Sequence, residues 1–307
     1  YNRNIYLDIL EDTRQDKELE SRYQADPKTY DKAAWEYVVV SGAADSTTDA
    51  DGNTVQATDE EQAAAKEAAK ATAEEILAAY NSGKSLESIA GNYEKATYYN
   101  TTDATYYDGV VGNWLFDDAR KDGDTEILEV GTNYYVGLFH SRGREEYKTV
   151  DIRHILITPE TGTKAQGDEG YEDEQTQLKA AARTKAEEIL AQWKSGEATE
   201  DSFAQLALEN SADGSKYDGG LYTRVTKGWA VEEFNDWCFD ASRKDGDTGI
   251  VDTTYGSHVM YFVGYDLPAW AASVTSDLQE KAASEWSTAL SENADVQQSD
   301  FGMKFVG

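Results

Sequence analysis

Apolar positions along the chain follow two patterns, and the succession of these patterns occurs twice. Short apolar runs typical of strands occupy residues 35–40 and 152–157. Each run is followed, after a polar loop, by a long stretch with an apolar residue at every third or fourth position, which predicts an amphipathic helix. The apolar positions of the two helices are Ala65, Ala69, Ala73, Ile76, Leu77 and Tyr80, and Leu178, Ala182, Ala186, Ile189, Leu190 and Trp193.

Both copies continue with two shorter helices and close on a pair of strands. The first short helix has its apolar residues around Ile89 or Leu206, and the second surrounds Trp114 or Trp237. The closing strand pairs are residues 127–130 with 135–139, and 250–253 with 258–263. One strand, three helices and a strand pair predict an α+β domain, in which helices pack on a small, mostly antiparallel sheet.

The two copies also match residue by residue. The run at 114–127 recurs at 237–250, including the segment Arg-Lys-Asp-Gly-Asp-Thr, with an offset of 237 − 114 = 123. The segment Ala-Glu-Glu-Ile-Leu-Ala at 73–78 recurs at 186–191, with an offset of 186 − 73 = 113. Similarity over this distance indicates duplicated domains and not a solenoid. We expect one domain at 35–145 and the other at 146–266.

Two flanks, 1–34 and 267–307, lie outside the repeat. Ile5, Ile9 and Leu10 predict a short amphipathic helix, and residues 18–23 predict another. At the other end an extended tail is expected at 296–305, after one longer helix. Its apolar stripe comprises Leu278, Ala282, Trp286, Ala289 and Leu290. An apolar stripe needs a partner surface, so the hypothesis is that the flanks pack together, or onto a domain that precedes Tyr1.

Both copies carry a polar, acidic loop between the opening strand and the long helix, at 41–60 and 158–175. The segment Asp49-Ala-Asp51-Gly52-Asn53 is similar to the beginning of a calcium-binding loop. However, Thr58 stands where such a loop needs its last glutamate. We therefore expect a turn at this point, with calcium binding as the lesser alternative.

Composition narrows the function. The 307 residues include 28 Lys and Arg against 59 Asp and Glu, a formal net charge of −31, which excludes nucleic acid as a partner because phosphate binding needs clustered cations. The single cysteine, Cys238, has no metal-ligand spacing around it and is expected in the core. No apolar run is long enough to span a membrane. Since the chain begins at Tyr1, we expect a mature form or a fragment that lacks an upstream targeting segment.

Candidate chemistry rests on two of the three histidines. His154 and His258 lie on or beside predicted strands of the second copy, and antiparallel pairing of these strands would bring their rings together. Either histidine alone is interpreted more simply as a hydrogen-bonded strand residue.

In this setting the second copy resembles the parvulin-type peptidyl-prolyl cis/trans isomerases, over about 115 residues. The resemblance rests on Arg153-His154-Ile-Leu, Ser195-Gly196, Phe203-Ala-Gln-Leu206-Ala207, Ser211-Ala-Asp213, Gly219-Gly220-Leu221, Ala230-Val-Glu-Glu-Phe234 and Tyr255-Gly256-Ser-His258. It implies two tandem domains of the FKBP-like superfold, the first of them degenerate.

The resemblance also implies the roles of single residues. His154, Asp213 and His258 form the polar centre, with Thr253 and Ser211 in the surrounding hydrogen-bond network. The proline pocket is formed by Leu221, Trp229, Ala230 and Phe234. Two departures from the family pattern affect this pocket: the Gly-Gly-Asp-Leu-Gly turn lacks its Asp and final Gly, and the usual methionine is Ala230, with Trp229 beside it.

Isomerisation of this kind needs no metal, cofactor or covalent step, because the barrier of roughly 18–20 kcal/mol comes from amide resonance that is lost when the C–N bond twists. An apolar slot for the proline ring and polar groups that favour the twisted amide are sufficient. Phosphopeptide-specific relatives carry basic residues after the first strand. The acidic loop at 158–175 therefore predicts no phosphate requirement.

The first copy lacks the polar centre. Repeat alignment puts Tyr37 at the position of His154 and Tyr135 opposite His258, while His140 is expected beyond the strand. It also puts Tyr107 and Val111 opposite Ala230 and Phe234. We expect no isomerase activity there, and a binding or spacing role. Aromatic residues that could form either the core or a peptide-contacting face are Tyr98, Tyr99, Tyr106, Tyr107 and Trp114.

The function implied by the resemblance is an extracytoplasmic folding factor, secreted or anchored at the cell surface. Its substrates would be unfolded or partly folded polypeptides that contain proline, and the helical flank at 1–34 would be the remnant of a chaperone module. The alternative is a non-catalytic chaperone or peptide-binding protein on parvulin-like scaffolds. A surface adhesin is a third alternative, without a specific motif.

Overall fold

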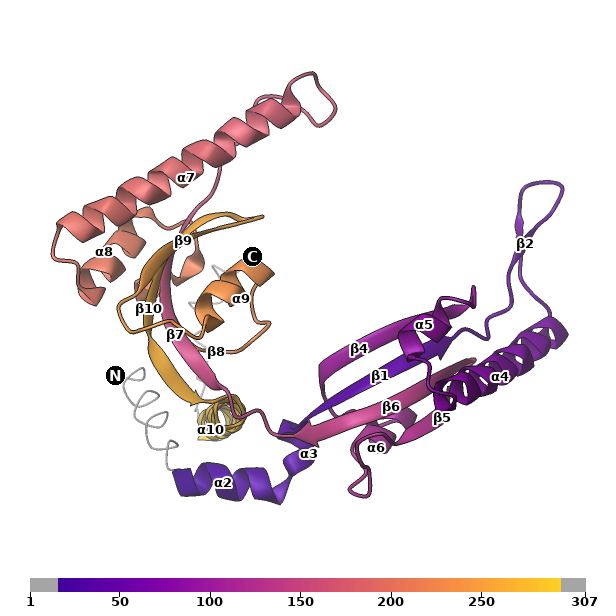
Figure 1. Cartoon of the computed structure of the whole chain (residues 1–307). Coiled ribbons are helices and arrows are strands. Elements are labelled where there is room, and N and C mark those ends of the chain that lie inside the picture. The colour runs from indigo at the N-terminus through magenta and orange to yellow at the C-terminus, as the bar shows by residue number, and fades with distance from the viewer. Residues whose placement is uncertain (1–15, 294–307) are drawn as a thin grey trace, which may run out of the picture. The chain divides into compact units, whose positions relative to one another are not determined.

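The computed structural model describes residues 16–293, and contacts within the chain divide it into two units. Among the described residues, one unit comprises 16–145 with 281–293, and the other comprises 146–280. The expected helix around residues 5–10 and the expected tail at 296–305 lie outside the described residues. Each unit is a mixed helix and sheet domain, as the sequence predicts (Figure 1).

The second unit is built on a four-stranded antiparallel sheet with the order β8-β7-β10-β9. Its strands are β7 (Lys148–Ile157), β8 (Leu221–Val225), β9 (Thr248–Thr253) and β10 (Gly256–Pro268). Strands β7 and β10 lie in the centre, so each has hydrogen-bonded neighbours on both sides. The expected antiparallel sheet is confirmed.

Helices cover both faces of this sheet. Side chains alternate between the faces along a strand. Ile155 and Ile157 of β7 therefore pack with α7 (Tyr171–Ser195) and α8 (Glu200–Asn210). Ile152 of β7 packs with α9 (Glu232–Phe239) on the other face. His154 has the same parity as Ile152, which assigns it to the α9 face.

The two helices on the α7 face have local reasons to form where they do. Helix α7 buries the predicted apolar stripe, and the buried Trp193 donates its indole N–H to the Thr199 carbonyl at 2.9 Å. Thr199 also caps α8, because its hydroxyl accepts the Ser202 N–H while the Ser202 hydroxyl accepts the Thr199 N–H. This exchange joins the end of one helix to the beginning of the next.

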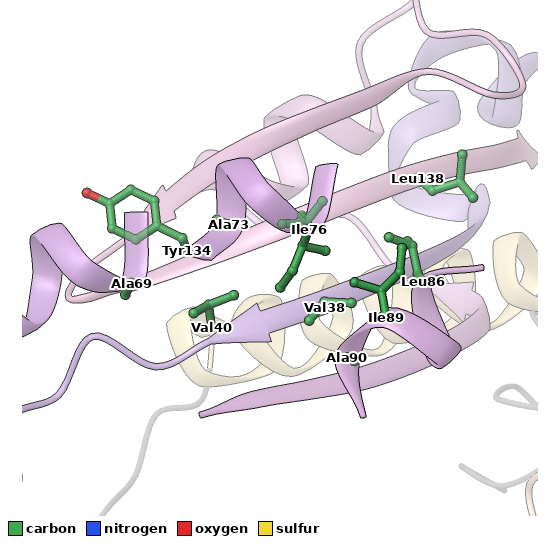
Figure 2. Packing of buried hydrophobic residues seen from close by; sticks show 11 residues of the cluster. Val38, Val40, Ala69, Ala73, Ile76, Leu86, Ile89, Ala90, Tyr134 and Leu138 are labelled. Carbon is green, nitrogen blue, oxygen red and sulfur yellow. The ribbon is translucent and has the colours of Figure 1, made fainter. Parts of the chain in front are cut away.

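The first unit repeats the architecture. Its sheet has the order β4-β1-β6-β5, with β1 (Lys32–Val40), β4 (Ala96–Ala104), β5 (Thr125–Val130) and β6 (Asn133–Gly143). Val38 and Ile76 belong to the cluster buried between this sheet and the helices α4 (Asp59–Asn81) and α5 (Leu86–Ala90), which Figure 2 shows. Helix α6 (Val110–Leu115) packs Trp114 onto the other face, where it is buried with Trp35.

Each sheet contains one strand that the pattern of apolar positions did not predict. Strand β8 follows directly after Gly220 and is short, so its residues were interpreted as a turn. Strand β4 has the sequence Ala-Thr-Tyr-Tyr-Asn-Thr-Thr-Asp-Ala, without regular apolar alternation. Its content of Thr and Tyr is nevertheless typical of a strand and would have been the signal to use.

The acidic loop of the first unit forms a small hairpin of β2 (Thr47–Thr48) and β3 (Thr54–Val55). At its tip the Asp49 carboxylate accepts the backbone N–H groups of Asp51 and Asn53, at 3.0 and 2.8 Å. The predicted turn is confirmed. Within residues 16–293 no group of His, Cys, Asp or Glu side chains has an arrangement that could hold a metal ion.

The helical flanks are confirmed for the described part of the chain, as α2 (Asp16–Ala25), α3 (Pro27–Tyr30) and α10 (Ala269–Asn293). Leu19 of α2 is buried, and the Tyr23 hydroxyl donates to Asp31 at 2.7 Å. Packing of the two flanks against each other stays a prediction. A search of the described helices for one long and apolar enough to cross a membrane found none.

One glycine links the edge strand to the central strand of the second unit. Gly220 has φ = +74°, a conformation that favours glycine, and its carbonyl accepts the His154 N–H at 2.9 Å. A Cβ at this position would lie 2.3 Å from the His154 carbonyl oxygen. No side chain fits between the two segments, so this approach requires glycine.

The variant Gly220→Ala is therefore expected to lower the free energy of unfolding by about 2–3 kcal/mol, through strain and steric clash. Gly214→Ala is the matched control, because a Cβ there has no neighbour within 4 Å. Urea denaturation of both variants measures the difference. Equal stability of the two variants would contradict the proposed constraint.

Candidate active site

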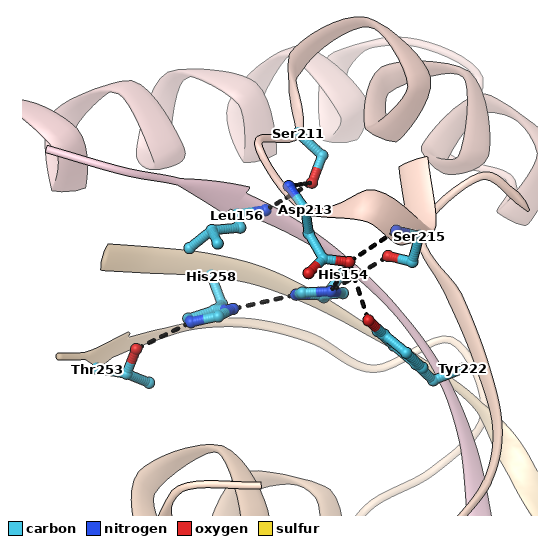
Figure 3. Close-up of polar contacts among 8 residues, drawn as sticks. All are labelled: His154, Leu156, Ser211, Asp213, Ser215, Tyr222, Thr253 and His258. Atoms are coloured by element: carbon cyan, nitrogen blue, oxygen red, sulfur yellow. Dashed lines mark hydrogen bonds and ion pairs between the residues drawn. The ribbon is translucent and has the colours of Figure 1, made fainter. Parts of the chain in front are cut away.

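The pairing of β7 with β10 brings the two histidines together. His258 lies opposite Leu156 in the antiparallel register, so His154, two residues away along β7, is its diagonal neighbour on the same face. The two Nδ1 atoms lie 3.0 Å apart, and the rings stack with an interplanar angle of 18° (Figure 3). Both side chains are buried.

Asp213 reaches this pair from the segment after α8. The buried Ser211 hydroxyl accepts the backbone N–H of Leu156 at 3.0 Å and that of Asp213 at 3.2 Å, which ties the segment to β7. The Asp213 carboxylate then lies 3.3 Å from Nε2 of His154. Its Oδ1 atom also accepts the Ser215 N–H at 2.8 Å.

Thr253 completes the arrangement at the other end. It is the last residue of β9, and its hydroxyl lies 2.9 Å from Nε2 of His258. The same oxygen accepts the Tyr255 N–H at 3.1 Å, which holds it in the tight hairpin between β9 and β10. Four predicted site residues thus form one continuous polar chain, in the order Asp213, His154, His258 and Thr253.

Burial determines the charge of the histidines. It lowers the pKa of His154 below its usual value of 6.5, and the nearby Asp213 opposes this shift only in part. Burial, followed by repulsion from His154, lowers the pKa of His258 to about 4. Both rings are therefore neutral near pH 7.

The carboxylate keeps its charge in the same surroundings. Burial acts to raise the pKa of Asp213, but hydrogen bonds from Ser215, the charge that His154 carries at the low pH where this carboxyl titrates, and the Tyr222 hydroxyl outweigh it and lower that pKa to about 2. Tyr222 donates to Oδ1 of Asp213 at 3.0 Å. Asp213 is consequently an anion at neutral pH.

The ionised carboxylate favours one arrangement of protons, which we infer from the hydrogen-bond geometry. An ionised carboxylate only accepts, so His154 donates to Asp213 from Nε2 and has Nδ1 free to accept. His258 then donates from its Nδ1, and its Nε2 accepts the Thr253 hydroxyl. In this inferred arrangement all donors of the polar chain point toward Asp213.

A cavity of about 350 Å³ opens beside the polar chain. Three of the predicted pocket residues, Trp229, Ala230 and Phe234, contribute to its lining. Phe234 of α9 is buried with its ring 5.3 Å from that of His258. The full lining is His154, Leu156, Asp213, Tyr222, Trp229, Ala230, Val231, Phe234, Tyr255 and His258.

The fourth predicted pocket residue, Leu221, does not line this cavity. Leu221 pairs with Arg153 in the β7–β8 ladder, which places its side chain on the face away from His154. Its neighbour Tyr222 pairs with Ile152 and lines the cavity instead. The family turn Gly-Gly-Asp-Leu therefore aligns without a gap, with Leu221 at the Asp position and Tyr222 at the pocket Leu position.

Several lining residues had not been predicted. Tyr222 could have been found from that gap-free alignment, which places it at the pocket position of the glycine turn. Tyr255 carries no comparable signal, since it lies in a turn whose path only the structure shows. The same holds for Ser215, which contacts Asp213 from a short 3-10 helix (Gly214–Asp218) without lining the cavity. Cys238 is buried as predicted, and burial raises the pKa of its thiol to about 12, which keeps it protonated.

The first unit has aromatic rings where the second has histidines. Tyr37 and Tyr135 stand in the same register relation on β1 and β6, and their rings stack at 5.7 Å. Tyr37 also stacks on Trp35 at 4.0 Å and on Tyr99 at 5.0 Å. Trp114 is buried, in agreement with its interpretation as a core residue.

His140 requires a correction. It lies within β6 and not beyond the strand. Its Nε2 atom lies 2.9 Å from a carboxylate oxygen of Glu36. Glu36 and His140 share the face opposite to Tyr37 and Tyr135, because side chains alternate along a strand. His140 therefore has no part in a site that corresponds to the polar chain.

Comparison with known proteins finds a family match that lies mainly in the second unit, which holds the polar chain. Residues 136–263 match the sequence model described as the PPIC-type PPIase domain, and residues 1–42 match that of a domain of unknown function, DUF5113. The foldase protein PrsA 1 of Listeria innocua is 29% identical over 142 residues, which are 45% of this chain and 39% of that protein. Its counterpart from Listeria monocytogenes is 28% identical over the same shares.

Solved structures with similarity to the chain include PrsA from Bacillus subtilis, at 22% identity and a TM-score of 0.32, covering 50% of this chain and 52% of that one. PrsA from Bacillus anthracis has 20% identity and a TM-score of 0.29, covering 50% and 64%. The chain spans less than half the length of the Listeria relatives. Residues 136–263, which include most of the second unit, thus match the PPIC-type PPIase domain, and the polar residues that the parvulin resemblance implies are assembled there.

Proposed function

We propose that the second unit is an active peptidyl-prolyl cis/trans isomerase. The observation that carries this proposal is the continuous polar chain from Asp213 to Thr253, which borders a largely apolar cavity formed in part by Ala230 and Phe234. The cavity suits a proline ring, and the polar chain suits the amide that precedes it.

The mechanism follows from what the twisted amide requires. When the C–N bond rotates, resonance is lost and charge shifts away from the carbonyl oxygen toward the nitrogen, whose lone pair becomes available. A fixed anion near the carbonyl disfavours the planar, polarised amide and so favours the twisted state. Asp213 supplies this anion, and the two neutral histidines hold it in place. No proton is transferred between these groups while the amide rotates.

The proposed substrates are unfolded or partly folded polypeptides that contain proline. The loop at 158–175 has six acidic residues and one lysine, so no phosphate is required before the proline. The similarity to PrsA foldases supports a role in the folding of exported proteins outside the cytoplasm, either secreted or anchored at the cell surface.

Variants of the polar chain test the activity. His154→Ala and Asp213→Ala are each expected to lower kcat/KM for a prolyl peptide about tenfold or more, because a lost transition-state interaction of about 1.4 kcal/mol corresponds to a factor of ten. A protease-coupled assay measures the rate. The matched control is His140→Ala, which changes a histidine on the opposite sheet face of the first unit.

Two results would decide against this proposal. If wild-type protein does not accelerate isomerisation above the uncatalysed rate, the second unit is not an isomerase. If wild type and both polar-chain variants accelerate it equally, the activity does not depend on the assembled chain.

The pKa values predict the pH dependence. Because burial lowers the histidine pKa values in the folded protein, the unfolded chain binds protons more readily below about pH 6.5, and protons then favour unfolding. The resulting stability is fully present above pH 6.5 and is lost as the pH falls toward 4. We expect kcat/KM to stay level from pH 8 to 6.5 and to fall only at lower pH.

Exchange spectroscopy by NMR on a prolyl peptide measures this profile without an auxiliary protease. If kcat/KM has an inflection centred on pH 6.5, the histidines titrate with ordinary pKa values. That result would contradict the lowering of their pKa values by burial.

Non-catalytic peptide binding is the second candidate function, and exposed aromatic residues of the first unit favour it. Tyr99 and Tyr107 are 45% and 53% exposed, beside the Tyr37 stack. Exposed aromatic rings in a group are typical of contact surfaces.

The double variant Tyr99→Ala, Tyr107→Ala is expected to weaken suppression of client aggregation by the full chain severalfold, with prolyl isomerase activity retained. Light scattering of a refolding client measures the effect. The control is Val55→Ala, which changes an exposed apolar residue on the hairpin of β2 and β3. Equal suppression by all three proteins would remove the support for a binding surface at these tyrosines.

A further inference from the structure

Two exposed aromatic rings at the cavity have no role in the mechanism above. Trp229 is 50% exposed and Tyr255 is 63% exposed, although both line the cavity. The Trp229 ring packs against Tyr222 at a centroid distance of 4.7 Å, which supports the indole from one side. An exposed, supported indole face is a favourable contact for a cation or for the aliphatic part of a long side chain.

The cavity carries a net negative charge. Asp213 is the only Asp, Glu, Lys or Arg side chain in its lining, and with a pKa of about 2 it is ionised. Both histidines are neutral near pH 7. Glu232 and Glu233 follow the lining residue Val231 and are exposed at the beginning of α9, so they extend the negative charge beyond the cavity.

Two lysines, Lys216 and Lys227, are close to lining residues in the sequence, but each lies near an aromatic ring outside the cavity lining. The Lys216 ammonium lies 5.4 Å from the Tyr217 ring centroid. That of Lys227 lies 4.7 Å from the centroid of Tyr147. Neither lysine belongs to the cavity lining, so neither contributes a positive charge there.

One oxygen of Asp213 is available to a ligand. Its Oδ1 atom accepts from the Ser215 N–H and the Tyr222 hydroxyl and lies 3.3 Å from Nε2 of His154. No hydrogen bond or ion pair to its Oδ2 atom is found among residues 16–293, and Figure 3 shows this second oxygen without a contact. A partly buried anion with a free oxygen is well suited to a charge-assisted hydrogen bond.

From these features we propose that the site prefers substrates with lysine or arginine immediately before the proline, and that Trp229 is the residue that determines this preference. The rotating amide joins that residue to the proline, so its side chain begins two bonds from the carbonyl carbon that Asp213 is proposed to face. Its aliphatic part lies along the Trp229 ring, and its charged end is directed to the free oxygen of Asp213.

This proposal rests on the isomerase function proposed above and specifies its substrate class. It also gives a physical reason for rejecting phosphate. A phosphorylated or acidic residue before the proline would bring a second negative charge to a cavity that already holds one, and like charges repel strongly where water is partly excluded.

The test compares four peptides that differ only before the proline: lysine, its uncharged analogue norleucine, glutamate and phosphoserine. Wild type is expected to show kcat/KM about fivefold higher for lysine than for norleucine, a factor typical of a cation on an exposed aromatic ring. Glutamate and phosphoserine are expected to be slower than norleucine. Raising the salt concentration should reduce the lysine preference, because ions screen exposed charges.

Two variants assign the preference to its residue. In Trp229→Leu, which keeps an apolar side chain, the ratio of lysine to norleucine is expected to fall to about two or less, since the ring contribution of roughly 0.5–1 kcal/mol is lost. The control is Tyr217→Leu, because Tyr217 is 78% exposed but does not line the cavity. Its ratio is expected to equal that of wild type.

The outcomes separate the two levels of the proposal. If no peptide is accelerated, the isomerase function fails, and the preference fails with it. If peptides are accelerated but norleucine equals or exceeds lysine, the function stands and the charge preference is wrong. If lysine is preferred equally by wild type and Trp229→Leu, the indole does not determine the preference.

Discussion

The register between β7 and β10 is the constraint on which the rest of the site depends. It makes His154 and His258 diagonal neighbours on the α9 face, and a slip by one residue would turn one ring to the opposite face. The remaining site residues are attached to the same two strands. Ser211 is bonded to the β7 backbone, and Thr253 stands at the hairpin that leads into β10. The positions of the residues in the polar chain are thus set by the pairing of the two strands. The side chains then determine where its charge lies.

Burial of the two histidines and the hydrogen bonds to Asp213 fix the charge of each group in the polar chain. Two imidazoles in water would exchange protons near neutral pH, whereas the buried pair stays neutral. The carboxylate at the end of the chain keeps its charge because it receives several hydrogen bonds. Such preorganised groups need little rearrangement when the substrate amide twists, and this is the usual source of electrostatic catalysis in proteins.

The sequence predicted the strands and helices that carry strong periodicity, and the polar centre that the family resemblance implies. It predicted less well where chain paths are set by tertiary contacts. The edge strands β4 and β8 were missed because neither has a regular apolar pattern, whereas the opposite edge strands β5 and β9 were predicted from theirs. Leu221 was assigned to the pocket because a gap was assumed in the glycine turn, whereas the alternation of β8 presents Tyr222 to the cavity. His140 was placed outside a strand that extends three residues beyond it, to Gly143.

The stacked tyrosines of the first unit show what the shared scaffold tolerates. Tyr37 and Tyr135 occupy the register positions of the histidine pair, and the sheet and helices around them are otherwise arranged in the same way. The central face of this fold therefore accepts either a polar pair or an aromatic pair without a change of architecture. The residues that stabilise the fold are different from those that form the polar chain. A protein with both copies can therefore lose the active site of one copy while both domains still fold.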